Sequence, residues 1–287
     1  MKTIVLGAFG QLGSDLVPRL PGEAIALRRA DVELTDTGAV RALLESHKPT
    51  FVINCAAYNL VDKAESEPEV AIANNALAVR GLALACRDLD LPLVHFSTDY
   101  VFGMGIDSEP MPLTETVGPI PVSAYGVSKL AGEFFVRTLC PKHMIFRVCG
   151  LYGVRGSGGK GGNFVETMLK VAGMGKPLRV VADQFCTPTY TVDVADAVVA
   201  MLPTRAWGLY HLTNAGHTSW HDFASEIFRQ ANVEANLTAI SAKEFGAAAA
   251  RPAWSVLDNA KIHRVGIAPR RDWTDALAAY LAERSRR

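Results

Sequence analysis

The sequence lacks the features that mark disulfide-stabilised, membrane-spanning and secreted proteins. Its five cysteines are scattered, odd in number and without a Cys-x-x-Cys pair, which indicates reduced, mostly buried thiols of a cytoplasmic protein. Because it has no run of about 18 apolar residues, we expect no membrane span. The apolar stretch at the N-terminus is too short, and too interrupted by glycine, for a signal peptide.

An excess of charge of either sign is also missing. The 29 basic and 29 acidic side chains balance to a net charge of +0, so no basic field indicates nucleic acid or an anionic membrane as a partner. Hydrophobic residues make up 49% of the 287 positions and charged residues 20%. These values fit a soluble globular protein with one large or two small domains.

The first motif that is present is a glycine-rich turn near the N-terminus. Residues 2–7 form a β-branched run typical of a central parallel strand, and a helical pattern begins at Ser14. Between them lie Gly7, Gly10 and Gly13, whose missing side chains let the backbone approach a pyrophosphate. The order of strand, turn and helix predicts a dinucleotide-binding unit, and the alternative is a plain tight turn.

The next strand predicts which dinucleotide is bound. It covers residues 24–27 and ends at Arg28-Arg29. An acidic residue at this strand end would bind the 2′-hydroxyl of NAD, whereas an arginine favours the 2′-phosphate of NADP. Arg28 therefore favours NADPH, with NADH as the other coenzyme, and the alternative is that both arginines are merely solvated.

The main chemical motif is Tyr125 and Lys129, four residues apart at the start of an apolar helical run. Residues i and i+4 share one helix face, so both side chains can enter one site. We expect the Lys129 ammonium to lower the pKa of Tyr125 from its ordinary value of about 10, so that the phenol can exchange a proton near neutral pH. The hydroxyl of Ser97 or Thr98, after the strand at 92–96, would hold a carbonyl oxygen.

Alternating strands and helices predict an α/β fold with a Rossmann-type doubly wound parallel sheet and a smaller C-terminal α/β substrate domain. We expect residues 1–150 and about 186–214 to form the NADP(H)-binding domain, and about 151–185 and 215–287 to form the substrate domain. In the second half we predict helices over 163–174, 190–202, 220–231 and 273–284, and strands over 178–181 and 208–212. Arg155 and Lys160, in a glycine-rich stretch, would close on a diphosphate or belong to a solvated connector.

The glycine turn, the hydroxyl residues at a strand end and the Tyr-x-x-x-Lys motif, taken in this order, resemble the extended short-chain dehydrogenase/reductases. Further motifs resemble the dTDP-4-dehydrorhamnose reductase family over nearly the whole chain. They are residues 61–68, 97–102, 125–133, 163–165, 183–184 and 187–189, and Arg251-Pro252 before Ser255. The resemblance implies an oxidoreductase that uses NADPH or NADH to reduce the 4-keto group of dTDP-4-dehydro-L-rhamnose, which gives dTDP-L-rhamnose.

The resemblance also implies roles for individual residues. Tyr125 exchanges the proton, Lys129 lowers its pKa and binds the nicotinamide ribose, and Thr98 polarises the carbonyl. The residues at cofactor positions are Gly7, Gly10, Gln11, Leu12, Arg28, Glu33, Leu34, Ala56, Ala57, Tyr58, Tyr125 and Lys129. The residues at substrate positions are Thr98, Asp99, Gly150, Asn163 and Arg251. The expected partners are a nucleotide-sugar substrate and a second copy of the chain in a homodimer.

Three positions in two regions depart from the family pattern. Cys149 and Gly150 stand where the family usually has a serine followed by a tryptophan that packs on the sugar nucleotide, so the sugar contact would be weaker or reshaped. The family can carry a magnesium ion held by glutamates at a dimer contact, and the first matching position here is Asp15. The sequence leaves Mg²⁺ open, and we assign no metal-binding residue.

Related activities differ in the residues they require. A sugar-nucleotide 4,6-dehydratase has a glutamate after the aspartate that follows the threonine, whereas here Asp99 is followed by Tyr100, which cannot act as a carboxylate base. The 4-epimerase pattern at this strand end also differs, so a net reductase is favoured. Two alternatives remain: a reductase of another nucleotide-linked 4-keto-6-deoxy sugar, and a non-catalytic NADP-binding regulatory subunit similar to methionine adenosyltransferase β.

Overall fold

The structure is a computed structural model that describes residues 1–103, 110–155 and 162–286. Its centre is a six-stranded, wholly parallel sheet with strand order β10-β5-β4-β3-β1-β2. The strands are β1 (Lys2–Leu6), β2 (Glu23–Leu27), β3 (Phe51–Asn54), β4 (Leu93–Thr98), β5 (His143–Val148) and β10 (Gly208–His211). This topology confirms the predicted Rossmann-type α/β fold.

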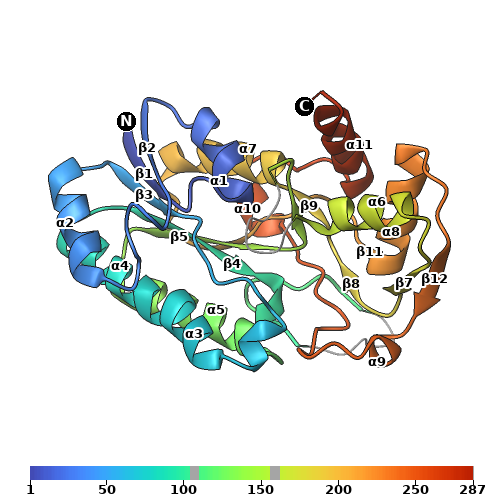
Figure 1. Ribbon diagram of the computed structural model, residues 1–287. Coiled ribbons are helices and arrows are strands. Elements are labelled where there is room, and N and C mark those ends of the chain that lie inside the picture. Colours follow the sequence, from blue (N-terminus) through green and yellow to red (C-terminus); the bar gives the residue numbers. More distant parts are fainter. Residues whose placement is uncertain (104–109, 156–161, 287) are drawn as a thin grey trace.

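Helices cover both faces of this sheet (Figure 1). On one face, α1 (Gln11–Leu16) packs against α7 (Thr191–Met201). On the other face, α4 (Ala78–Asp88) packs between α2 (Thr37–His47) and α5 (Ala124–Leu139). Each face therefore has its own apolar core, and the continuous apolar strands β1, β3, β4 and β5 are buried on both sides, as expected for a parallel sheet.

Of the described helical stretches, the one formed by α3 (Pro68–Ile72), the π-helical η3 (Ala73–Leu77) and α4 is long and apolar enough to cross a membrane by length and composition alone. Half of its apolar window is buried inside the protein. Because η3 and α4 pack against α5, the stretch occupies the place of a core helix beside the sheet.

A second group of elements lies beside the carboxyl ends of the strands (Figure 1). It contains the strand pairs β7–β12, β8–β11 and β6–β9 and a core built from α6, α8 and α11. The bounds of its elements are β6 (Leu151–Tyr152), α6 (Phe164–Gly173), β7 (Leu178–Val181), β8 (Phe185–Cys186), β9 (Thr189–Tyr190), β11 (Thr218–Ser219), α8 (Trp220–Ala231), β12 (Leu237–Ile240), α9 (Ala242–Phe245) and α11 (Trp273–Arg284). The remaining short helices are η1 (Val17–Arg19), η2 (Lys63–Glu65), η4 (Asp99–Val101), η5 (Leu202–Thr204) and α10 (Ala260–Arg264).

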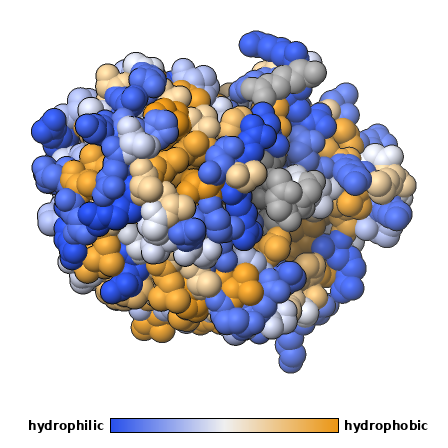
Figure 2. Space-filling model, turned by 60° about the vertical axis from the view of Figure 1, so that its left-hand side comes forward, coloured by the Kyte–Doolittle hydropathy of each residue, from blue (hydrophilic) through white to orange (hydrophobic). Residues whose placement is uncertain are grey.

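The helices and strands predicted for the second half are confirmed, with ends that shift by one residue where a cap intervenes. The helix expected from Asn163 begins at Phe164 because the Asn163 side chain is its N-cap and accepts a hydrogen bond from the Glu166 N–H at 3.0 Å. Ser219 caps α8 in the same way. Hydrophilic and hydrophobic residues are interspersed on the visible face of the protein (Figure 2).

Candidate active site

The glycine turn between β1 and α1 adopts a conformation that depends on missing side chains. Gly7 has φ +72°, in the left-handed region, and a Cβ there would lie 2.7 Å from the Ala56 backbone nitrogen. A Cβ at Gly13 would lie 2.5 Å from the carbonyl oxygen of Gly7. The turn thus packs directly against the chain that leaves β3, and its close approach requires glycine at both positions.

Two of the predicted cofactor residues, Gln11 and Leu12, use their side chains for packing. Gln11 Nε2 donates a hydrogen bond to the Leu151 carbonyl at 2.8 Å, which ties α1 to β6. Leu12 is buried in the core below α1. Within the described residues, Gln11 Oε1 is buried without a hydrogen-bond partner.

The predicted cofactor residues after β3 are held by the last residue of β3 and by the helical stretch that follows. The Ala56 N–H donates to Asn54 Oδ1 at 3.0 Å, and the Tyr58 N–H donates to Asn75 Oδ1 at 2.9 Å. The Tyr58 hydroxyl donates to Glu67 Oε1 at 2.5 Å. These bonds fix the backbone of residues 56–58 at the carboxyl end of β3.

The segment after β2 carries the exposed cation on which the coenzyme prediction depends. The Arg28 guanidinium lies 4.3 Å from the centre of the Phe9 ring, and its side chain is 60% exposed. Arg155 approaches the same ring at 6.0 Å, whereas Lys160 lies outside the described residues. Glu33 pairs with Arg29 at 2.5 Å, and Leu34 packs against the core. Two cations therefore flank the tip of the glycine turn.

Lys129 lies in α5 next to the strand that carries the hydroxyl residues. Its side chain is 3% exposed, and Nζ donates a hydrogen bond to the Phe96 carbonyl at 2.7 Å. Burial lowers the pKa of Lys129 to about 8, and the nearby Glu133 carboxylate opposes that shift. The ammonium is thus anchored to β4, one turn from Tyr125 on the same helix face.

The expectation that Lys129 lowers the pKa of Tyr125 is wrong for this structure. Burial raises the pKa of Tyr125, the Asp99 carboxylate adds to the rise, and a hydrogen bond with Thr98 opposes it. The reason is that burial of the phenol outweighs the other contributions. Lys129 is not among the groups that shift it, and its Nζ donates to the Phe96 carbonyl. Tyr125 therefore carries its proton before the reaction.

The lowered pKa of Lys129 predicts a pH dependence of stability. Between about 8 and the ordinary value near 10.5 the unfolded chain binds more protons at Lys129 than the folded protein does, so the contribution of Lys129 to the free energy of unfolding rises with pH in this window. Buried cysteines with raised pKa values contribute in the opposite direction, equally in the wild type and in Lys129→Met. We therefore expect the wild type to gain stability relative to Lys129→Met from pH 8 to 10. Urea unfolding of both proteins at several pH values measures this difference, and a difference that does not change with pH would contradict the lowered pKa of Lys129.

The carboxylate of Asp99 is the most extensively bonded group at the site. It is 2% exposed and its Oδ1 accepts a hydrogen bond from Thr98 Oγ1 at 3.0 Å. Its Oδ2 accepts from Ser255 Oγ at 2.7 Å and from Cys149 Sγ at 3.1 Å. Burial raises the pKa of Asp99, and these three donors oppose the rise. The sequence placed Ser255 in a family motif only, and no local spacing pointed to its contact with Asp99.

The structure distinguishes the two hydroxyl residues at the end of β4. Thr98 contacts Asp99 and Tyr125, so its hydroxyl lies within the group that can polarise a carbonyl. Ser97 is 3% exposed, and its Oγ has no hydrogen-bond partner among the described residues. Because neighbouring residues of a strand point to opposite faces, the two hydroxyls do not share a site.

The remaining predicted substrate residues occupy different environments. Gly150 has φ +50°, and a Cβ there would lie 3.4 Å from the edge of the Trp220 indole. Arg251 forms a two-pronged ion pair with Asp62, with nitrogen–oxygen distances of 3.1 and 2.7 Å. This pair links the C-terminal segment to the chain after β3.

The Asn163 side chain forms hydrogen bonds within the protein. Its amide caps α6 through Glu166 and donates to the Gly153 carbonyl at 2.9 Å and to the Tyr280 hydroxyl at 3.3 Å. The side chain is 8% exposed. These bonds join three segments of the protein, and the substrate contact of Asn163 stays a prediction.

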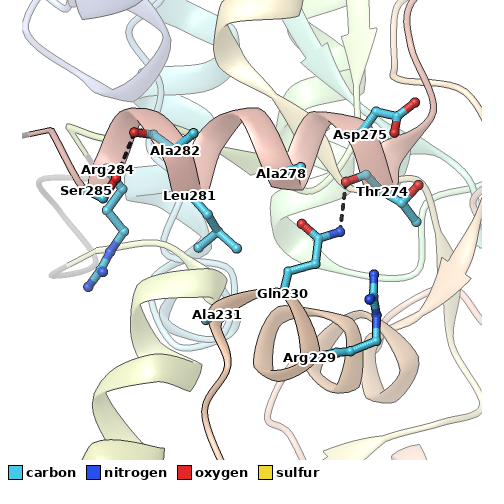
Figure 3. Close-up of a pocket in the computed structure, with 10 residues that line it drawn as sticks. All are labelled: Arg229, Gln230, Ala231, Thr274, Asp275, Ala278, Leu281, Ala282, Arg284 and Ser285. Carbon is cyan, nitrogen blue, oxygen red and sulfur yellow. Dashed lines mark hydrogen bonds between the residues drawn. The ribbon is translucent and has the colours of Figure 1, made fainter.

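A cavity of about 660 Å³ lies away from these residues, between α8 and α11 (Figure 3). Gln230 spans it and donates to the Thr274 carbonyl at 3.0 Å, while Arg229 and Arg284 line its two ends. It contains no group of the Tyr125 site.

Among the described residues, no group of three or more His, Cys, Asp or Glu side chains could hold a metal ion. Asp15, at the position where the family can bind magnesium, accepts a hydrogen bond from Thr191. The described residues therefore do not form a magnesium site within one chain.

Comparison with known proteins assigns this arrangement to a family. A dTDP-4-dehydrorhamnose reductase of Streptomyces griseus is 39% identical, with 96% of this chain and 91% of the relative covered. A dTDP-4-keto-6-deoxy-D-glucose reductase of Streptomyces niveus is 36% identical, with 96% and 95% covered. The crystal structure of a dTDP-4-dehydrorhamnose reductase from Bacillus anthracis in complex with NADP has a TM-score of 0.92 and 35% identity, with 98% and 99% covered. The family model of the RmlD substrate binding domain matches residues 1–286, and the chain belongs to that family.

Proposed function

We propose that the protein is an NADPH-dependent reductase that converts dTDP-4-dehydro-L-rhamnose to dTDP-L-rhamnose in nucleotide-sugar biosynthesis. The observation that supports this most is the meeting of Tyr125, Thr98 and Lys129 at the carboxyl end of β4 in a chain of this family. Ligands of open α/β sheets bind at this end of the strands. A relative 39% identical carries the name of this activity.

The chemistry divides between a hydride and a proton. NADPH, when bound, supplies the hydride that the carbonyl carbon accepts. Tyr125 donates its hydroxyl proton to the carbonyl oxygen as that oxygen becomes negative, and the Thr98 hydroxyl donates a hydrogen bond to the same atom. Lys129 lies one turn from Tyr125 on the same face of α5, where its ammonium would hydrogen-bond the nicotinamide ribose of bound NADPH. The carbonyl thereby gains one hydride and one proton and becomes an alcohol.

We assign the coenzyme to the domain formed by residues 1–150 and about 186–214, and the sugar nucleotide to residues of about 151–185 and 215–287. The main sheet and the second core of α6, α8 and α11 support this division. The proposed cofactor contacts are Gly7, Gly10, Gln11, Leu12, Arg28, Glu33, Leu34, Ala56, Ala57, Tyr58, Tyr125 and Lys129. The proposed sugar-nucleotide contacts are Thr98, Asp99, Gly150, Asn163 and Arg251.

Arg28 is expected to set the preference for NADPH over NADH. Its exposed guanidinium beside Phe9 can pair with a 2′-phosphate, and Arg28→Asp would place a negative charge there instead. We expect KM for NADPH to rise at least about tenfold and KM for NADH to change little. Steady-state kinetics with both coenzymes measure this, with Arg41→Asp as an exposed control on α2. Equal effects on both coenzymes would remove Arg28 from the site.

A substrate panel tests the proposed function. The purified protein is given NADPH with dTDP-4-dehydro-L-rhamnose, with dTDP-4-keto-6-deoxy-D-glucose, or with no sugar, and loss of reduced-nicotinamide absorbance is followed. We expect the highest kcat/KM with the rhamnose precursor. The second sugar is included because a relative 36% identical is named for it and because residue 150 is glycine. NADPH binding without consumption of any sugar would favour a non-catalytic, NADP-binding regulatory subunit.

We propose further that the protein works in the cytoplasm, accepts NADH as a second coenzyme and forms a homodimer. Leu77 in η3 and Phe134 in α5 support the dimer, since they are 54% and 48% exposed on neighbouring helical segments.

A further inference from the structure

The Asp99 carboxylate joins three segments that are far apart in the chain. Thr98 precedes it at the end of β4, Cys149 follows β5, and Ser255 lies 156 positions later in the C-terminal segment. Ser255 is 2% exposed and Cys149 is 1% exposed. The two donors to Oδ2 are therefore shielded from water, and a hydrogen bond to a buried carboxylate is worth more there than at the surface.

The Thr98 hydroxyl has one proton to donate, whereas the structure and the proposed reaction together give it two acceptors: Asp99 Oδ1 and the carbonyl oxygen of the sugar. It accepts a hydrogen bond from the Tyr100 N–H at 3.2 Å and donates its proton to Asp99 Oδ1. In the proposed reaction the same proton must face the carbonyl oxygen of the sugar. The Asp99 carboxylate can lose the hydrogen bond from Thr98 only if other donors stabilise its negative charge. Ser255 and Cys149 are those donors.

We propose that Ser255 and Cys149 are positioning residues, which hold the Asp99 carboxylate ionised and oriented through Oδ2 so that Oδ1 can exchange Thr98 for a hydroxyl of the substrate. The inference rests on the proposed reductase function. A sugar hydroxyl beside the carbonyl donates to Oδ1 while Thr98 turns its proton to the carbonyl oxygen. The number of hydrogen bonds to Asp99 is unchanged by this exchange.

The other groups that face Asp99 are neutral or paired elsewhere, so the hydrogen bonds from Ser255 and Cys149 are what stabilises the charge on Oδ2. Tyr100 and Tyr125 face it as neutral phenols, because burial raises the pKa of both. Burial also holds the pKa of Cys149 well above its ordinary value, so Cys149 remains a thiol that can donate, with the Cys186 thiol next to it. Arg251 approaches Tyr100 but forms its ion pair with Asp62.

Direct titration of Asp99 tests the proposal without a substrate. The protein is labelled with ¹³C at aspartate carboxyl carbons, the Asp99 signal is assigned with Asp99→Asn, and its pKa is measured by NMR. We expect Ser255→Ala to raise the pKa of Asp99 by about one unit, because it loses a hydrogen bond to a charged group. Cys149→Ser is expected to lower it, because a hydroxyl is a stronger donor than a thiol. Ser219→Ala is the matched control, since it removes a hydroxyl that is 1% exposed and bonded to the Asp222 N–H.

Kinetics supply the second readout. The acidic limb of the pH profile of kcat/KM should move up by about one unit in Ser255→Ala and down in Cys149→Ser, while the NADPH Kd is unchanged. Below the limb this is about a tenfold loss for Ser255→Ala. An Asp99 pKa that is the same in the wild type and both folded variants would overturn the proposal. If Ser255→Ala does not fold, Cys149→Ser decides alone, and absence of turnover in the wild type would contradict only the proposed reductase function.

Discussion

Tyr125→Phe is expected to lower kcat by about a thousandfold while the Kd for NADPH stays within about twofold. The phenol is the only described proton donor that shares a helix face with Lys129 and contacts Thr98, so its loss leaves the carbonyl oxygen without an acid. Phenylalanine keeps the edge-to-face contact with Tyr100, whose ring centre lies 6.1 Å away. Single-turnover kinetics with the sugar substrate, together with fluorescence titration of NADPH, measure the two quantities.

Tyr210→Phe is the matched control for this prediction. Its hydroxyl is also removed from a mostly buried ring, where it donates to the Ala206 carbonyl at 3.0 Å, far along the chain from α5. Turnover should then stay within about twofold of the wild type. Near-normal turnover in Tyr125→Phe would exclude the proposed proton donor, and a similar loss in both variants would indicate a general effect on folding.

Glu133→Gln is expected to lower the free energy of unfolding by about 3–5 kcal/mol. Glu133 and Arg147 form a two-pronged ion pair between α5 and β5, with distances of 2.8 and 2.7 Å, and their side chains are 0% and 1% exposed. The substitution leaves the buried Arg147 charge uncompensated. It also removes the carboxylate that opposes the lowered pKa of Lys129, so that lysine should lose its proton at a still lower pH.

Urea unfolding of Glu133→Gln and Glu45→Gln compares the loss of a buried ion pair with the loss of an exposed one. Glu45 pairs with Arg41 on α2 at 2.9 Å, and both side chains are about half exposed, so we expect an unfolding midpoint equal to that of the wild type. Equally small changes in the free energy of unfolding for the two substitutions would show that the Glu133–Arg147 pair does not stabilise the protein.

The sequence predicted the parts of the fold and site that depend on local spacing. The glycine turn, the apolar strands and the i, i+4 relation of Tyr125 and Lys129 each follow from residues within one or two elements. The predicted direction of the Tyr125 pKa was wrong because burial of the phenol dominates the shift, and burial depends on packing between distant parts of the chain. Lys129 Nζ likewise bonds a distant group, the Phe96 carbonyl, 33 positions earlier. Spacing along a helix does not contain that information.

Long-range contacts account for the other differences. Ser255 reaches Asp99 across 156 positions, so its role could not be read from neighbouring residues. Asn163 has a structural role that the family motif did not indicate. Its position just before a helix is a common N-cap signal, and in the structure its side chain caps α6.

Transfer of deuterium tests the central claim most directly. The protein is given dTDP-4-dehydro-L-rhamnose and NADPH that carries deuterium at the transferable position, and the product is analysed by NMR and mass spectrometry. The account predicts dTDP-L-rhamnose with one deuterium on C4 from the wild type and none formed by Tyr125→Phe on the same timescale. A wild-type product without deuterium on C4, or a sugar left unreduced while NADPH is bound, would contradict it.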